Sequence, residues 1–304
     1  MTINQHQAPS NKHPVTSTQH PAISLIDESF DKNLLSQYHL SLQLGLEGFS
    51  FCILNTKRNK YIGLESWHFE RIQNSVSLCV ILDKLIQKND LLQMRYKSAS
   101  ALIVHNRSTL IPTPLFEKSN EEDYLGFNHS IDKDEKVAAD KLSNLDSLNL
   151  YILPQCVDST LKNAFPGVSI FHHSSSLIEG LLIQYKNHND KKLIIHFRDS
   201  HFDVVVLDGK NLILFNSFDY QTKEDFVYYI LFVCEQLQLN PENQELVLIG
   251  EIEKNSDHYS LLYKYIRNIS LGERSDSFEY SYLFNDTPKH FYYNLFSQYL
   301  LNTD

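Results

Sequence analysis

Residues 39–55 read HLSLQLGLEGFSFCILN, and residues 192–208 read KLIIHFRDSHFDVVVLD. The offset between the two stretches is constant, so that Phe49 aligns with Phe202 (202 − 49 = 153). In both stretches apolar side chains recur at every second position on either side of a polar turn. This is the pattern of two half-buried strands joined as a hairpin. The chain therefore carries one hairpin pattern twice.

A third strand pattern and then a helical pattern follow each hairpin. The third strands are expected at 61–67 and 212–218, and the helices at about 71–92 and 223–239. Apolar residues at helical spacing mark the buried face of each helix. A duplicated β-β-β-α unit predicts an α/β fold of two similar lobes with a cleft between them.

These patterns divide the chain into three parts. We expect a disordered tail at 1–22, because this segment is rich in Gln, Asn, His, Ser, Thr and Pro. The first lobe is expected at 23–187, with an irregular, locally acidic insertion around 108–146. The second lobe is expected at 188–304. The insertion is a candidate interaction surface, since long polar excursions from a compact lobe are often functional.

Composition excludes several classes of protein. The chain has 304 residues, 42% of them hydrophobic, and a formal net charge of −10. An acidic chain lacks the basic footprint of a nucleic-acid-binding protein. No apolar run reaches the length of a membrane span, so no direct membrane insertion is expected. The four cysteines form no CxxC pair and no secretory signal is recognisable, which indicates a cytoplasmic protein.

The order of elements resembles a known architecture. A β-β-β-α-β-α-β-α order in each half resembles the ribonuclease-H-like lobe, and two such lobes form the actin-like ATPase fold. From 148 to 182 the chain continues as strand, Pro154, helix, Gly167, strand and helix. In this layout it is similar to the actin-like platform proteins of type IV pilus assembly. The resemblance implies mixed sheets flanked by helices in each lobe.

A more specific resemblance rests on five short stretches. They are GFSFCI at 48–53, STLIPTPLF at 108–116, DYLGFN at 123–128, DFVYY at 225–229 and LIGEI at 248–252. Through them the chain resembles the uncharacterised Bacteroidetes family DUF3822, from roughly Ser29 to its C-terminus. The resemblance implies an actin-like fold and no established activity.

The first hairpin lacks the acid that an actin-like ATPase needs. Such enzymes hold the phosphates of Mg-ATP in two hairpin loops, each with an Asp near the end of its first strand and a small residue after it. The Asp positions Mg²⁺ or its waters, and Gly lets backbone N–H groups reach phosphate oxygens. Here Gln43 stands near the expected acid and is neutral, whereas Gly45 and Gly48 remain.

The second hairpin departs further from that pattern. His196 stands at the expected acid, Arg198 replaces a small residue, and the loop contains no Gly. Asp199 would supply an acid only if the strand register slipped, and a slip of one residue exchanges the two faces of a strand. The adenosine loop normally has paired glycines after a buried strand, and here only Gly250 is present, followed by Glu251.

We therefore predict a non-catalytic scaffold or protein-interaction module with an unidentified protein partner and no cofactor. The candidate cleft residues are those of the altered loops: Gln43, Gly45, Gly48, Arg198, Asp199 and Gly250. The alternative is an Mg-ATP-binding ATPase or kinase-like enzyme with displaced acids, for which the candidates are Glu47, Asp199, Asp219 and Glu251. A weaker alternative is a small-anion site at Arg198 or Arg107.

Two further patterns have an ordinary structural interpretation. His172 and His173 follow a strand, where neighbours point to opposite faces, so no metal site is expected. The C-terminal segment alternates Phe and Tyr at 278–284 and clusters them again at 291–299. Core packing is the favoured interpretation of these aromatic residues. A partner surface is the alternative, because Tyr is enriched at interfaces.

Overall fold

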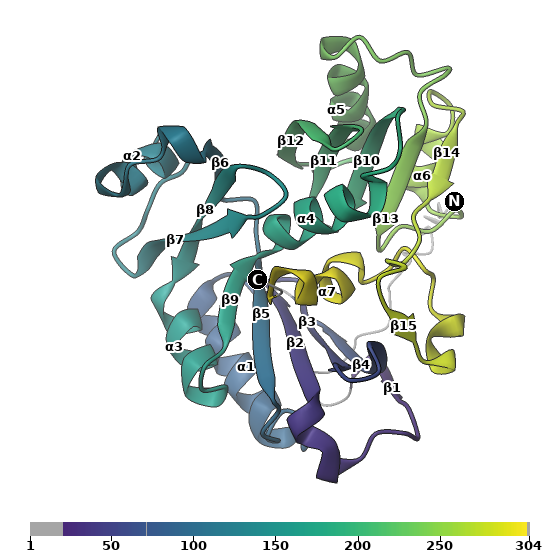
Figure 1. Cartoon of the computed structure of the whole chain (residues 1–304). Helices are drawn as coiled ribbons and strands as arrows, with labels where there is room; N and C mark the ends of the chain where they lie inside the picture. The colour runs from purple at the N-terminus through teal and green to yellow at the C-terminus, as the bar shows by residue number, and fades with distance from the viewer. Residues whose placement is uncertain (1–20, 71, 303–304) are drawn as a thin grey trace, which may run out of the picture.

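The structure, a computed structural model, describes residues 21–70 and 72–302. Three β-sheets are arranged around a central pair of helices, with further helices on the outside (Figure 1). The tail predicted at 1–22 lies outside the described residues apart from its last two positions. Within the described part of the chain, no helix is long and apolar enough to cross a membrane.

The first sheet is formed mainly by the N-terminal half. Its strand order is β1-β4-β3-β2-β5-β9. These strands are β1 (Ile23–Ile26), β2 (Tyr38–Gly45), β3 (Gly48–Asn55), β4 (Lys60–His68), β5 (Ser98–Val104) and β9 (Ser169–His172), and a 3₁₀ turn, η1 (Lys32–Gln37), precedes β2. One face packs on α1 (Ser75–Lys88) and α3 (Gln155–Ala164). This face carries the alternating apolar residues that the hairpin pattern predicts, so the first hydrophobic core lies here.

The second sheet repeats that plan. Its order is β12-β11-β10-β13-β14. The strands are β10 (Lys191–Phe197), β11 (His201–Asp208), β12 (Asn211–Asp219), β13 (Leu246–Gly250) and β14 (Ile269–Leu271). One face packs on α5 (Lys223–Gln236) and α6 (Asp257–Leu262). The other face packs on α4 (His173–Tyr185), the helix that directly follows the last strand of the first sheet.

The duplication extends to the details of strand pairing. Leu44 pairs with Phe49 in the first hairpin, and their equivalents Phe197 and Phe202 pair in the second. β2 runs parallel to β5, as β10 does to β13. Both sheets have a register shift at the same place, between Ile53 and Leu54 in one and at their equivalents 206/207 in the other. The predicted α/β fold of two like halves is confirmed.

The insertion is a small ordered unit rather than an irregular excursion. β6 (Ser108–Pro112), β8 (Ser147–Pro154) and β7 (Glu135–Leu142) form an antiparallel sheet that projects from the first half together with α2 (Glu121–Gly126) (Figure 1). Two 3₁₀ turns, η2 (Thr113–Leu115) and η3 (Lys118–Asn120), precede α2. Leu125, Leu150 and Ile152 form its own buried core.

The C-terminal segment returns to the first sheet. β15 (Glu279–Tyr280) pairs in parallel with β4, although we expected this region to belong to the second lobe. It continues as η4 (Tyr282–Asp286), α7 (Tyr293–Ser297) and η5 (Gln298–Asn302). Most of its aromatic residues are buried against Tyr61 and Leu64, and Tyr282 is the exposed exception. Core packing is thus the correct interpretation of these aromatics, because the second face of the first sheet is apolar and needs a cover.

Candidate functional site

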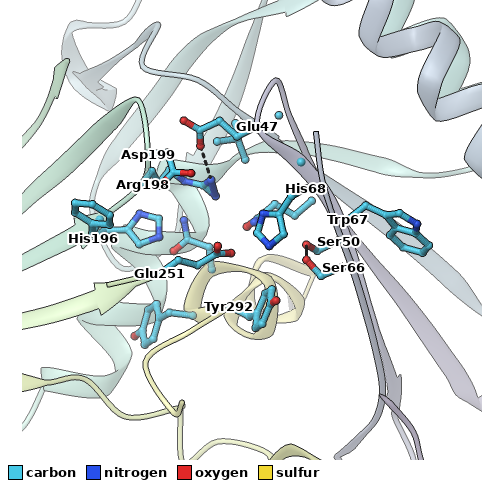
Figure 2. A pocket seen from close by; sticks show the side chains of 18 residues that line it. Glu47, Ser50, Ser66, Trp67, His68, His196, Arg198, Asp199, Glu251 and Tyr292 are labelled. Carbon is cyan, nitrogen blue, oxygen red and sulfur yellow. Dashed lines mark hydrogen bonds and ion pairs between the residues drawn. The ribbon is translucent and has the colours of Figure 1, made fainter. Parts of the chain in front are cut away.

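All six predicted cleft residues line one pocket. Gln43, Gly45 and Gly48 come from the β2–β3 hairpin, Arg198 and Asp199 from the β10–β11 hairpin, and Gly250 from the end of β13. Figure 2 shows the two hairpins facing each other across this pocket. The structure thus brings these residues together, while their binding of a cofactor stays a prediction.

The pocket is small. Its cavity volume is about 60 Å³, whereas pockets for small organic ligands usually measure about 300–1,000 Å³. Large side chains occupy its walls, among them Trp67, Phe197, Tyr292 and Tyr293. A neighbouring pocket, which shares Gly45 and Glu47 with the first, measures about 160 Å³. Both volumes lie below the range that is usual for pockets of small organic ligands.

Direct contacts join the two halves beside the pocket. Glu47 at the tip of the first hairpin lies 3.8 Å from a guanidinium nitrogen of Arg198 (Figure 2). The Ser200 backbone N–H also donates to Glu47 Oε1, at 2.7 Å. Near this contact, Asn106 Nδ2 donates to Asp219 Oδ1 at 2.7 Å. Two of the four displaced acids of the alternative hypothesis are therefore engaged in holding the halves together.

The cleft glycines have local packing reasons to be glycine. Gly250 has a φ of +90°, and a Cβ there would lie 2.2 Å from the carbonyl oxygen of Phe197. A Cβ at Gly48 would lie 2.5 Å from the carbonyl oxygen of Trp67, and one at Gly45 would lie 3.0 Å from Val104 Cβ. Close approach of neighbouring strands accounts for all three glycines without a phosphate ligand.

The positions of the two expected acids offer no anionic ligand. Gln43 Oε1 is buried without a hydrogen-bond partner among the described residues. His196 Nδ1 lies 3.0 Å from Asp203 Oδ2 on the neighbouring strand. Burial lowers the pKa of His196, although the hydrogen bond to Asp203 opposes this effect, so the imidazole is neutral near pH 7. Mg²⁺ favours carboxylate and phosphate oxygens, which neither residue supplies.

Three carboxylates nevertheless converge on the pocket. Glu47, Asp199 and Glu251 all contribute to its lining, close to Gly45 and Gly250. Desolvation raises the pKa of Glu251; Asp199 and Glu47 add to this rise, whereas His68 and Arg198 oppose it. This convergence is the arrangement that the alternative enzyme hypothesis requires.

Arg107 is not available as an anion site. Its guanidinium donates to both oxygens of Glu135, at 2.6 and 2.7 Å, and to the backbone carbonyl of Ser130. The carboxylate of Glu135 already neutralises the charge of Arg107. Of the two arginines proposed for anion binding, only Arg198 faces the pocket.

A buried histidine cluster lies beside the pocket and was not predicted. His172 ends β9 and His173 begins α4, so the alternation of a strand does not apply and the two rings lie 4.5 Å apart. His196 and His201 join them from the second hairpin, with Asp203 at the centre. The sequence did contain a signal, because the hairpin register places His196 directly opposite Asp203.

Most of the chain matches the model of one protein family. The model for "Protein of unknown function (DUF3822)" matches residues 27–269. The chain belongs to the DUF3822 family. No curated protein matches it significantly.

Two solved structures relate this DUF3822 protein to the actin-like fold. A Bacteroides thetaiotaomicron VPI-5482 protein, described as having an actin-like ATPase fold and unknown function, is 27% identical with a TM-score of 0.74, covering 90% of this chain and 99% of its own. A PilM-PilN type IV pilus biogenesis complex matches at 11% identity and a TM-score of 0.56, covering 87% and 97%. This DUF3822 protein therefore has the actin-like ATPase fold, as predicted.

Proposed function

We propose that this protein is a non-catalytic member of the actin-like fold that acts as a scaffold by binding another protein. The observation that carries the proposal is the small volume of the pocket, beside which Glu47 contacts both Arg198 and Ser200. The protein keeps both lobes of this fold, but side chains fill the space between them. The two-lobed structure is therefore retained without a site for ATP. Such a two-lobed structure is suited to presenting a surface to another protein.

The insertion is the surface that we assign to the partner. Phe127 and Leu115 on it are 89% and 67% exposed, which is unusual for side chains of this size. Residues 113–134 carry six Asp and Glu residues and two Lys. The partner chemistry that fits is a basic segment with apolar anchors. The similar PilM structure is described as a complex with PilN, which illustrates that a protein of this fold forms complexes with other proteins.

Site-specific cross-linking tests the scaffold role. A photoreactive residue at position 127, introduced into the full chain in its own cells, is expected to form a covalent adduct with one protein, and Leu115→Ser is expected to abolish it. Position 282 provides the matched control, because Tyr282 is also exposed, at 60%, but lies on the C-terminal segment. No adduct at 127, or the same adducts at 127 and 282, would contradict the proposal.

One observation favours a second candidate, an Mg-ATP-binding enzyme. Glu47, Asp199 and Glu251 lie around one pocket with Gly45 and Gly250, so an opened cleft would present acids to a nucleotide. The enzyme hypothesis predicts phosphate release from Mg-ATP that Asp199→Asn and Glu251→Gln each reduce at least about tenfold. Asp208→Asn, at the last residue of β11 and outside the pocket lining, is the matched control. The scaffold proposal predicts no turnover by any of these proteins.

A further inference from the structure

We propose that the histidine cluster beside the pocket contains a binding site for a divalent transition-metal ion, with His173, His201 and Asp203 as its ligands. One potential ligand atom from each residue lies within 4.8 Å of the other two. The three side chains are buried, at 0%, 4% and 0% exposure. This inference is independent of the scaffold proposal.

The tautomer of His173 leaves a lone pair directed at the carboxylate. His173 Nε2 lies 2.9 Å from the carbonyl oxygen of His105, which accepts hydrogen bonds only, so Nε2 carries the proton. Nδ1 is then unprotonated, and it lies 3.6 Å from Asp203 Oδ2. Nδ1 has no hydrogen-bond partner among the described residues. A lone pair that faces a buried carboxylate repels it unless a cation lies between them.

His201 presents a second nitrogen to the same point. Its Nδ1 lies 3.1 Å from Ser200 Oγ, which holds the ring in place. Its Nε2 is buried without a partner in the described part of the chain. The rings of His173 and His201 are 5.7 Å apart, edge to face.

The surrounding groups match the outer shell of a metal site. Ligating histidines generally donate their other ring nitrogen to a carbonyl or another acceptor, and ligating carboxylates are themselves hydrogen-bonded. His105 O and Ser200 Oγ serve the two histidines. Ser217 Oγ donates to Asp203 Oδ1 at 2.5 Å, and His196 Nδ1 lies 3.0 Å from Oδ2. The carboxylate is thereby fixed in orientation.

The chemistry of the three ligand side chains indicates which metal ions would bind. Two imidazoles and one carboxylate suit Zn²⁺, Fe²⁺ and Co²⁺, whereas Mg²⁺ and Ca²⁺ prefer oxygen ligands alone. Ligand atoms about 2.1 Å from a tetrahedral zinc ion lie about 3.4 Å apart. The pair of His173 and Asp203, at 3.6 Å, already fits this spacing. Three protein ligands leave a fourth position for water or another ligand.

The site joins segments that are far apart in the chain. His173 is the first residue of α4, which follows the first sheet, and the other two ligands lie on β11 of the second sheet. A bound ion would therefore link the two halves close to the pocket. Because it binds only the folded arrangement, it would stabilise the whole protein.

Cobalt binding tests the site directly. The full chain, freed of metal with a chelator, is expected to bind one Co²⁺ with the visible absorption of a four-coordinate ion, and excess Zn²⁺ should displace it. The melting midpoint should rise by about 5 °C at saturating Zn²⁺ and remain unchanged with Mg²⁺. His201→Gln should weaken Co²⁺ binding at least about a hundredfold.

Three variants keep the test decisive. His201→Cys replaces one ligand with another and should restore binding with a new thiolate-to-cobalt band in the near ultraviolet, which a purely structural effect would not produce. His290→Gln alters another buried histidine, hydrogen-bonded to Ile252, and should bind as the parent does. Replacing His6, His13 and His20 together by Asn should also leave binding unchanged. A folded parent that binds no Co²⁺, or equal binding by His201→Gln, would overturn the proposal.

Discussion

Gln43 and His196 stand at the end of the first strand of each half, where Mg-ATP binding by this fold calls for an acid. Both side chains are neutral: Gln43 lines the small pocket, and His196 lies 3.0 Å from Asp203 on the neighbouring strand. The neutral residues belong to a packed interior. The change from acid to neutral residue is therefore part of how this cleft is filled.

Buried histidines make the stability of the protein sensitive to acid. His39 is fully buried between Ser98 and Ser100, and desolvation, aided by Lys97, lowers its pKa to about 4. The unfolded chain takes up the proton near pH 6.5 and the folded chain does not. Stability from this residue is thus complete above pH 6.5 and is lost as the pH falls from 6.5 towards 4.

His39→Gln should reduce that loss. Between pH 7 and pH 4 the variant is expected to lose roughly 3 kcal/mol less of its free energy of unfolding than the parent. Urea denaturation at both pH values measures the difference. Equal losses in parent and variant would show that His39 is not the group responsible.

Gly250 is required by the approach of two strands. Gly250→Ala would place a Cβ against the backbone of Phe197 at a positive φ, and is expected to lower the free energy of unfolding by about 3 kcal/mol. Gly126→Ala is the matched control, since its Cβ would meet no atom within 4 Å, and should change stability by less than about 1 kcal/mol. Urea denaturation of both variants gives the comparison. Equal effects would contradict the steric explanation.

At the scale of elements, the two hairpins form a latch across the cleft. The tip of β2–β3 contacts the turn of β10–β11 through Glu47, Arg198 and the backbone of Ser200. The ion pair is partly exposed and contributes little to global stability. Its effect is expected to be local, because it joins only the tips of the two hairpins.

Hydrogen exchange at Ser200 reports on that latch. Glu47→Ala removes the acceptor of the Ser200 N–H, and exchange of this amide should become about tenfold faster while the melting midpoint changes by less than about 2 °C. Glu235→Ala, which removes an exposed carboxylate on α5, is the control and should leave the Ser200 amide unaffected. Unchanged exchange in Glu47→Ala would mean that the latch is not formed in solution.

Elements with local signals could be predicted from the sequence. The two hairpins follow from alternation, and Thr222 forms with Asp225 the capping box that precedes α5. The hairpin register also places His196 opposite Asp203, but the contribution of His173 to the cluster could not be predicted, because it depends on His173 beginning a helix instead of continuing a strand. The fold of the insertion also depended on the long-range pairing of β8 with β6, to which the local hairpin of β7 and β8 gives no clue.

At the scale of the whole molecule, the C-terminal segment packs against the first sheet. After completing the second sheet it returns to the first, and Tyr61 of β4 donates to the carbonyl oxygen of Phe296 at 2.6 Å. This return buries an apolar face that neither hairpin pattern predicts. It also ties the two halves together at a second place, because α7 packs on α4 as well as beside the first sheet.

Truncating the C-terminal core should therefore destabilise the first half. Phe296→Ala is expected to cost about 4 kcal/mol, since Phe296 is 1% exposed and packs against Tyr61, Tyr280 and Phe284. Tyr282→Ala, at an exposed position of the same segment, should cost less than about 0.5 kcal/mol. The fluorescence of Trp67, the single tryptophan, measures unfolding of the first sheet. Equal stability of the two variants would contradict the docking of this segment.

The central claim is that an actin-like fold has lost its nucleotide site. The most direct test is the melting midpoint of the full-length protein with and without millimolar Mg-ATP or Mg-ADP. A ligand at 100 times its dissociation constant adds roughly 2.7 kcal/mol to the stability of the folded state, which raises the midpoint by about 5 °C. The account predicts no change with either nucleotide. A clear rise that Arg198→Ala or Asp199→Asn abolishes would contradict it.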